Sequence, residues 1–150
     1  MKKTISIIIL LALLALVSCT AKSVEIDVAE AAQTILDGVT FRDSLFRIED
    51  DAVVYYYGDK VEGLPCAVYV GSGATAEQVA VFEAEDEAAA DIVLDAMKSH
   101  VESEINSFRD YIPEEVAVLE NAITVKSGRY VALVVGGGSD TLKVVESAMK

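Results

Sequence analysis

The chain's only histidine, His100, stands four residues before Glu104. On a helix, residues at this spacing lie one turn apart on the same face, so the pair could supply two ligands to a metal ion. Structural zinc sites need four ligands, and catalytic zinc sites need three from the protein. With no second histidine in the chain, the pattern favours a surface His–Glu pair over a metal centre, and we predict no metal site.

Two acidic clusters could attract a divalent cation. One is the run at 49–51, and the other comprises Glu83, Glu85, Asp86 and Glu87. Calcium takes about six to eight oxygen ligands, usually from a loop of alternating acids with a glycine. Neither cluster has that layout, and acids are favoured at a helix N-terminus by the helix dipole. The second cluster therefore predicts a helix that starts near Asp86, and weak divalent-cation binding stays an alternative.

Cys66 is a potential free thiol. Its neighbours Pro65 and Ala67 provide no positive charge, and a thiol becomes reactive only when a cation, a helix N-terminus or a metal lowers its pKa. Small cysteines are among the most buried residues in proteins. We therefore expect Cys66 to be buried and inert.

The run Gly136-Gly137-Gly138-Ser139 precedes a predicted helix, a position where phosphates often bind. It lacks the Gly-Lys-Ser/Thr ending of a P-loop, so Ser139 is predicted to be a plain helix N-cap. The chain has one histidine and no serine in an elbow motif, so the sequence does not indicate a hydrolase triad. We predict no catalytic residue and no bound cofactor, although paired carboxylates for an envelope hydrolase stay open as an alternative.

The chain begins with the pattern of a bacterial lipoprotein signal. Lys2 and Lys3 precede the apolar run 5–17, and the segment Leu16-Val17-Ser18-Cys19 overlaps the end of this run. The run is shorter than the roughly 20 apolar residues of a membrane-spanning helix, which favours a cleaved signal. We predict a signal peptide at 1–18, lipidation of Cys19, a tether at 19–26 and a single domain at 27–150. The predicted location is the outer face of the bacterial cell membrane.

The composition is strongly acidic. The formal net charge is −13, and loss of the two signal lysines would leave 10 basic against 25 acidic residues, a net charge of −15. Nucleic-acid binding depends on lysine and arginine at phosphates, so this balance excludes it. The predicted partners are the membrane, through lipid on Cys19, and an envelope protein or small ligand.

Hydrophobic periodicity indicates the elements that position these residues. Asp27 and Glu30 have the spacing of a capping box, and Gly38 would end that first helix. Residues 49–58 combine strand-type composition with helix punctuation. Residues 66–70, 78–83, 123–126 and 129–135 read as strands. A long helix from Asp86 carries one apolar stripe: Ala90, Leu94, Met97, Val101, Ile105, Phe108 and Ile112.

The order of these elements predicts an α+β fold. Two hairpins would make a four-stranded, mostly antiparallel sheet, and such sheets commonly pack helices on one face. The long helix is the expected cover, with shorter N- and C-terminal helices beside it. Pro113 either ends the long helix or opens a short one. If some of the six tyrosines gather at one exposed end of the sheet, they could form a recognition patch.

Four sequence segments, taken together, resemble the DUF4358 family of small lipoproteins, found largely in Firmicutes. They are the segments at 69–82, 108–115, 119–122 and 128–131, in that order. The resemblance covers roughly residues 27–150 and implies an extracytoplasmic α+β domain, with a helix at 50–57. The family has no assigned activity, so the resemblance implies no site residue. The sequence thus favours a non-catalytic binding or accessory module.

Overall fold

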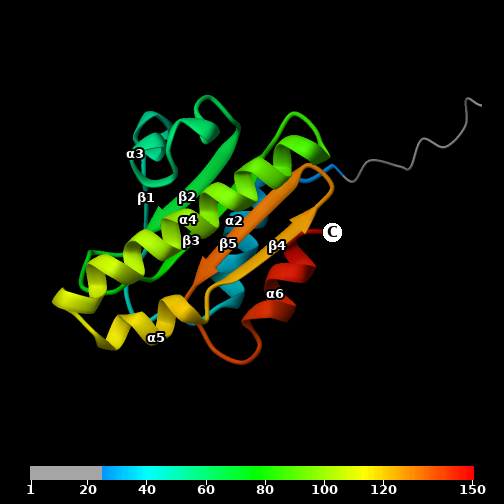
Figure 1. Cartoon of the computed structure of the whole chain (residues 1–150). Coiled ribbons are helices and arrows are strands. Elements are labelled where there is room, and N and C mark those ends of the chain that lie inside the picture. The colour runs from blue at the N-terminus through cyan, green and yellow to red at the C-terminus, as the bar shows by residue number, and fades with distance from the viewer. Residues whose placement is uncertain (1–24) are drawn as a thin grey trace, which may run out of the picture.

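The computed structural model describes residues 25–150 (Figure 1). Five antiparallel strands form one sheet in the order β1-β2-β3-β5-β4: β1 Phe46–Arg47, β2 Cys66–Val70, β3 Gln78–Glu83, β4 Ile123–Ser127 and β5 Tyr130–Val135. The hairpins β2–β3 and β4–β5 were both predicted, and β3 pairs with β5 to join them. The α+β class is confirmed, but the predicted count of four strands is wrong. Strand β1 is two residues long, too short for any periodicity to indicate it.

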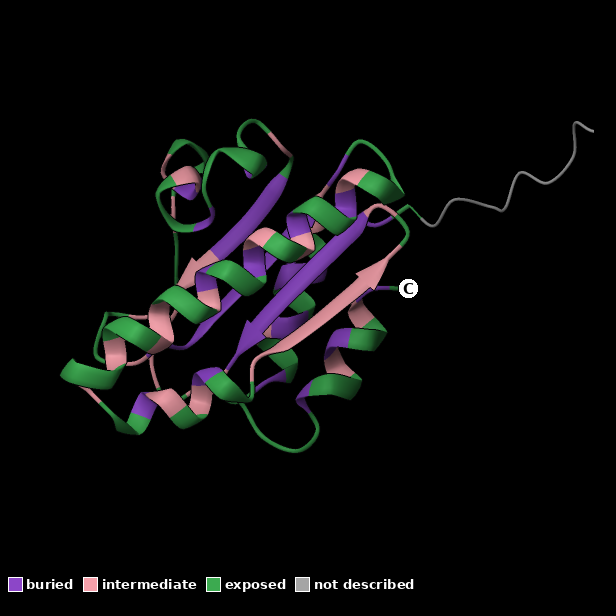
Figure 2. Cartoon of the chain, in the orientation of Figure 1, coloured by how far each residue is buried: buried purple, intermediate pink, exposed green. Residues whose placement is uncertain are grey.

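Helices cover both faces of the sheet, so the expected packing on one face is also wrong. Helices α3 (Val53–Tyr57), α4 (Glu87–Tyr111) and α5 (Glu114–Glu120) pack on one face, and α2 (Val28–Gly38) and α6 (Thr141–Ala148) pack on the other (Figure 1). The physical reason lies in β5, which is buried at every position (Figure 2). A strand that is apolar throughout, rather than alternating, belongs to a sheet covered on both sides.

Local signals account for most of the helix boundaries. Asp27 caps α2 by accepting hydrogen bonds from the backbone N–H groups of Ala29 and Glu30. Asp86 caps α4 in the same way through Ala89, as the acidic cluster predicted. The ambiguous segment is helical: a 3₁₀ turn at Asp50–Ala52 leads into α3.

One predicted helix boundary is wrong. Asp140, not Ser139, stands at the N-cap of α6, and Gly138 donates its N–H to the Thr141 hydroxyl. Pro113 opens α5, which is the second of the two expectations for it.

Candidate functional site

Four polar side chains meet in the core beneath α4. Gln78 is the first residue of β3, Tyr57 is the last residue of α3, and His100 and Glu104 lie one turn apart on α4. We call these four residues the pocket cluster. Tyr57, Gln78 and His100 are all buried, whereas the Glu104 side chain is 24% exposed. The sequence pair His100–Glu104 is therefore real, but it is not the surface pair that was expected.

The hydrogen bonds of the pocket cluster define its proton positions. The Tyr57 hydroxyl donates to Gln78 Oε1 at 2.7 Å, and Gln78 Nε2 donates to Glu104 Oε2. His100 Nε2 lies 2.9 Å from Gln78 Oε1 and 3.2 Å from Glu104 Oε2. Both oxygens are acceptors, so Nε2 carries the hydrogen. Burial, with a smaller contribution from the Glu104 charge, raises the pKa of Tyr57, and the phenol stays a neutral donor.

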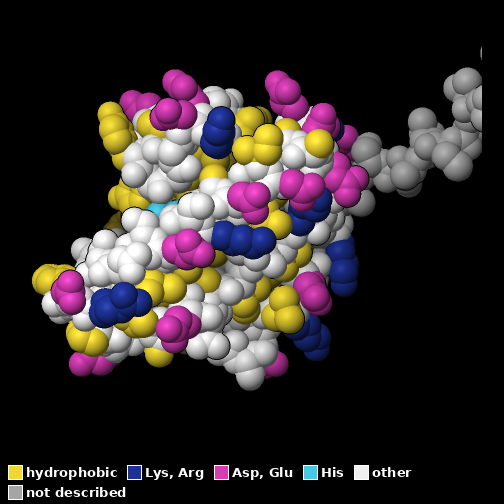
Figure 3. All heavy atoms as spheres, in the orientation of Figure 1, with side chains coloured by type: hydrophobic (Ala, Val, Ile, Leu, Met, Phe, Trp, Pro, Cys, Tyr) yellow, Lys and Arg dark blue, Asp and Glu magenta, His cyan; other side chains and the backbone are white. Residues whose placement is uncertain are grey.

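A pocket of about 190 Å³ opens beside this cluster. Tyr56 and Phe108 contribute aromatic side chains to its wall, and Gln78 and Glu104 contribute polar ones. In Figure 3 the histidine is visible as a small patch between α3 and α4. The residues that line the pocket are Tyr56, Val70, Gly71, Gly73, Thr75, Ala76, Glu77, Gln78, Glu104 and Phe108.

The exposed aromatics extend this wall outward. Phe46 on β1 pairs directly with Val70 on β2, so their side chains share a face of the sheet. Phe46 is 61% exposed and Tyr56 is 40% exposed. Tyr56 is the one tyrosine among the described residues that line the pocket, so the expected gathering of tyrosines is not seen there: Tyr130 is buried elsewhere and Tyr111 is exposed at the end of α4.

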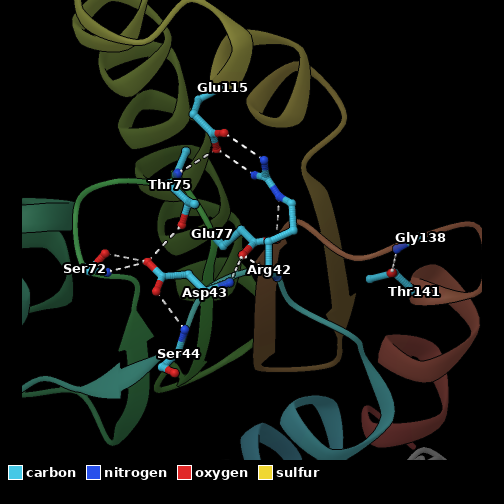
Figure 4. Close-up of polar contacts among 10 residues, drawn as sticks. Arg42, Asp43, Ser44, Ser72, Thr75, Glu77, Glu115, Gly138 and Thr141 are labelled. Atoms are coloured by element: carbon cyan, nitrogen blue, oxygen red, sulfur yellow. Dashed lines mark hydrogen bonds and ion pairs between the residues drawn. The ribbon is translucent and has the colours of Figure 1, made fainter.

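A second polar group lies next to the pocket, and we call it the Arg42 network (Figure 4). The Arg42 guanidinium makes a bidentate contact with Glu115 at 2.8 and 2.9 Å and a third contact with Glu77 at 3.2 Å. Glu77 also accepts the backbone N–H groups of Arg42 and Asp43, both at 2.8 Å, and Glu115 accepts that of Ala76. Hydrogen bonds from Arg42 lower the pKa of Glu115. The two carboxylates in turn raise the pKa of Arg42.

Asp43 fixes the loop that forms one wall of the pocket. Its carboxylate accepts hydrogen bonds from Ser72 N at 2.8 Å, Ser72 Oγ at 2.7 Å and Thr75 Oγ1 at 3.2 Å (Figure 4). These bonds, chiefly those of Ser72, lower the pKa of Asp43. The loop between β2 and β3 is thus tied to the segment between α2 and β1, which preorganises the pocket.

The glycine run after β5 has a packing role. Gly136 has φ +109°, and a Cβ there would lie 2.9 Å from Glu77 Cγ and Oε1. Gly137 has φ +81°, and a Cβ there would lie 2.6 Å from Val39. Only glycine fits these two close approaches, so Gly136 and Gly137 are explained by packing against neighbouring side chains.

The remaining predicted candidates lie outside the pocket. Cys66 is free and buried, as expected, and burial raises the pKa of its thiol, which disfavours the reactive thiolate. Glu83 pairs with Arg129, and Glu87 lies near Lys126. Within residues 25–150, no three His, Cys, Asp or Glu side chains are grouped to hold a metal ion. Cys19 lies outside the described residues.

Sequence reasoning missed Gln78, Glu77 and Arg42. One signal was available: Glu77-Gln78 directly precedes the apolar run of β3 at positions that the hairpin must bury. Buried polar side chains need partners, so this dipeptide predicts polar neighbours without naming them.

Comparison with known protein families gives a match to the part of the chain that contains the pocket cluster. Residues 44–136 match the family described as "Domain of unknown function (DUF4358)". The chain belongs to this family. The match is narrower than the resemblance suggested, since α2 and α6 lie outside it. All four residues of the pocket cluster lie inside this DUF4358 segment. No curated protein and no solved structure matches the chain.

Proposed function

We propose that this DUF4358 protein is a lipid-anchored, extracytoplasmic binding module that acts without catalysis. The support for the anchor is the sequence that ends in Leu16-Val17-Ser18-Cys19. Two or more acyl chains hold a protein stably at a membrane, and a diacylglyceryl group on the Cys19 thiol meets that requirement. Among the described residues, no helix is both long enough and apolar enough to cross a bilayer.

Mass spectrometry of the mature N-terminal peptide tests the anchor. We expect Cys19 to be the first residue and to carry the mass of a diacylglyceryl group, and we expect globomycin to block processing. Cys19→Ser is the matched variant, because it preserves the size of the side chain but removes the sulfur. A mature chain that starts elsewhere, or that bears no lipid, overturns this part of the proposal.

The observation that carries the binding function is the pocket beside Glu104. It combines a preformed wall, aromatic side chains and a partly exposed carboxylate, the usual features of a small-ligand site. Its volume of about 190 Å³ is below the roughly 300 Å³ at which pockets for drug-sized ligands begin. The pocket therefore suits a small molecule or the end of one side chain.

The pocket supports binding better than carboxylate-based hydrolysis. Glycoside hydrolases need two carboxyl groups that are both free to act, one as acid and one as base or nucleophile. Two glutamates line this pocket, but Glu77 is occupied by three hydrogen bonds from Arg42 and Asp43. Of the two, Glu104 alone has an oxygen that accepts no hydrogen bond from the described residues.

A fluorescence experiment tests the pocket, because the chain contains no tryptophan. Tyr56→Trp places one indole in the pocket wall and preserves an aromatic face. Tyr55→Trp is the matched control, since Tyr55 is the neighbouring residue, is 87% exposed and does not line the pocket. Both full-length variants are titrated with 1-aminobutane, 1-butanol and butyrate, which are cationic, neutral and anionic four-carbon probes.

We expect at least one probe to change the emission of Tyr56→Trp saturably while that of Tyr55→Trp stays constant. If no probe affects Tyr56→Trp, or if both variants respond equally, the pocket is not a ligand site.

A further inference from the structure

We infer that the pocket binds a primary ammonium group, an inference that rests on the proposed binding function. The first argument is charge. Among residues 25–150, the ionisable side chains that line the pocket are Glu77, Glu104 and the Tyr56 phenol, and no lysine or arginine of this range lines it. Glu77 already contacts Arg42, which it shares with Glu115. Glu104 therefore gives the pocket a negative charge that no lysine or arginine among its lining residues neutralises.

The hydrogen bonding of Glu104 indicates which kind of organic cation would bind. Its Oε2 atom contacts both Gln78 and His100, whereas no hydrogen bond within residues 25–150 reaches its Oε1 atom. A guanidinium group binds best to a carboxylate that offers both oxygens in a bidentate contact. An ammonium group is a compact charge with three donors and needs only one such oxygen. One free oxygen thus favours ammonium over guanidinium.

The aromatic wall points to the same ligand. Tyr56 and Phe108 line the pocket together with Glu104, and cations are attracted to the faces of aromatic rings within about 6 Å. A zinc ion fits poorly, since zinc sites take at least three protein ligands, and no such group exists in the described part of the chain. The net charge of −13 also raises the local concentration of cations at the surface.

A free amine and a lysine side chain carry the same ammonium group, and calorimetric titration of the full-length chain separates these sources. The probes are 1-aminobutane, Nα-acetyl-lysine N-methylamide and the Nε-acetylated form of the latter. We expect Nε-acetylation to abolish binding, because it removes the charge. Tighter binding of the lysine derivative than of 1-aminobutane identifies a peptide ligand, and the reverse order identifies a free amine.

Two matched variants test the role of Glu104. Glu104→Gln removes the charge but preserves the shape, and we expect it to weaken ammonium binding about tenfold or more. Glu102→Gln makes the same change of net charge at an exposed site on α4 that does not line the pocket, and we expect it to keep the wild-type affinity. Circular dichroism confirms that each variant is folded.

The outcomes separate this inference from the binding function itself. If 1-butanol or butyrate perturbs Tyr56→Trp more strongly than 1-aminobutane does, the pocket binds ligands but not ammonium, and only the inference fails. Equal loss of affinity in Glu102→Gln and Glu104→Gln also overturns it, because the effect is then general electrostatics. If no probe perturbs Tyr56→Trp, the proposed function fails with it.

Discussion

The pocket cluster and the Arg42 network are neighbours, yet they are built on opposite principles. Two adjacent residues belong one to each group: Glu77, directly before β3, is part of the Arg42 network, and Gln78, the first residue of β3, is part of the pocket cluster. In the Arg42 network, both carboxylates contact one guanidinium and accept backbone N–H groups, so their oxygens are already engaged by donors. In the pocket cluster, Glu104 keeps one oxygen without a partner among the described residues.

This difference separates a group that holds the fold from a group that can accept a ligand. Buried charges stabilise only when each is paired and hydrogen-bonded, and carboxylates whose oxygens are engaged by donors have no capacity left for a ligand. A partly exposed carboxylate in a preformed wall costs little to maintain and keeps its capacity. The comparison therefore predicts large effects on stability from the Arg42 network and small ones from Glu104.

The largest expected effect comes from Glu77→Ala. The Glu77 side chain is 1% exposed, and its loss leaves the backbone N–H groups of Arg42 and Asp43 without their acceptor. We expect a loss of about 3 kcal/mol in the free energy of unfolding. Urea unfolding followed by circular dichroism measures it. Glu146→Ala, an exposed change of the same charge on α6, serves as the control and should leave the midpoint unchanged.

The pH dependence of stability gives a sharper test of the same network. Arg42 lowers the pKa of Glu115 in the folded chain below its ordinary value of 4.5. The unfolded chain therefore takes up this proton at a higher pH than the folded chain does. The contribution of Glu115 is complete above its ordinary pKa and is lost as the pH falls toward the folded pKa.

Glu115→Gln removes this titration, so its stability should fall less steeply than that of the wild type between about pH 5 and the acid transition. At neutral pH we expect the variant to be less stable by about 1.5 kcal/mol, because a charged hydrogen-bond acceptor is lost. Urea midpoints measured across the pH range check both statements. Parallel curves for the two proteins would show that the Arg42–Glu115 contact does not stabilise the folded chain.

A smaller effect is expected from Tyr57→Phe in the pocket cluster. The change removes one buried hydrogen bond to Gln78 but preserves the ring, which packs edge-on against Phe82. Gln78 Oε1 still faces His100, so no buried acceptor is left without a partner. We expect a loss of about 1 kcal/mol, measured by urea unfolding. Tyr55→Phe at an exposed position should have no effect.

The sequence predicted the elements better than their assembly. The periodicity of α4 and the two hairpins were readable because each depends on residues close in the chain. The covering of both faces was missed, although Val131 to Val135 is apolar without alternation, which indicates a strand buried on both sides.

Only part of the site could be predicted from the sequence, because some of its contacts are local in the chain and others are not. His100 and Glu104 stand at helical spacing, so their contact follows from α4 alone. Their contact with Gln78 joins residues 22 and 26 positions apart, and the Arg42–Glu115 contact joins residues 73 positions apart. Side chains that meet across elements are specified by tertiary packing, which no local pattern reports.

The smallest effect on stability should come from Glu104→Gln, the same chemical change as Glu115→Gln in the other group. Because Glu104 is partly exposed and its amide replacement can still accept from Gln78, we expect the free energy of unfolding to change by no more than about 0.5 kcal/mol. Urea unfolding of the two variants side by side makes the comparison direct. If Glu104→Gln destabilises the chain as much as Glu115→Gln, the carboxylate of Glu104 holds the fold as the Arg42 network does. A stable Glu104→Gln variant that loses ammonium affinity instead separates the two groups by function, since the same change then costs stability in one and binding in the other.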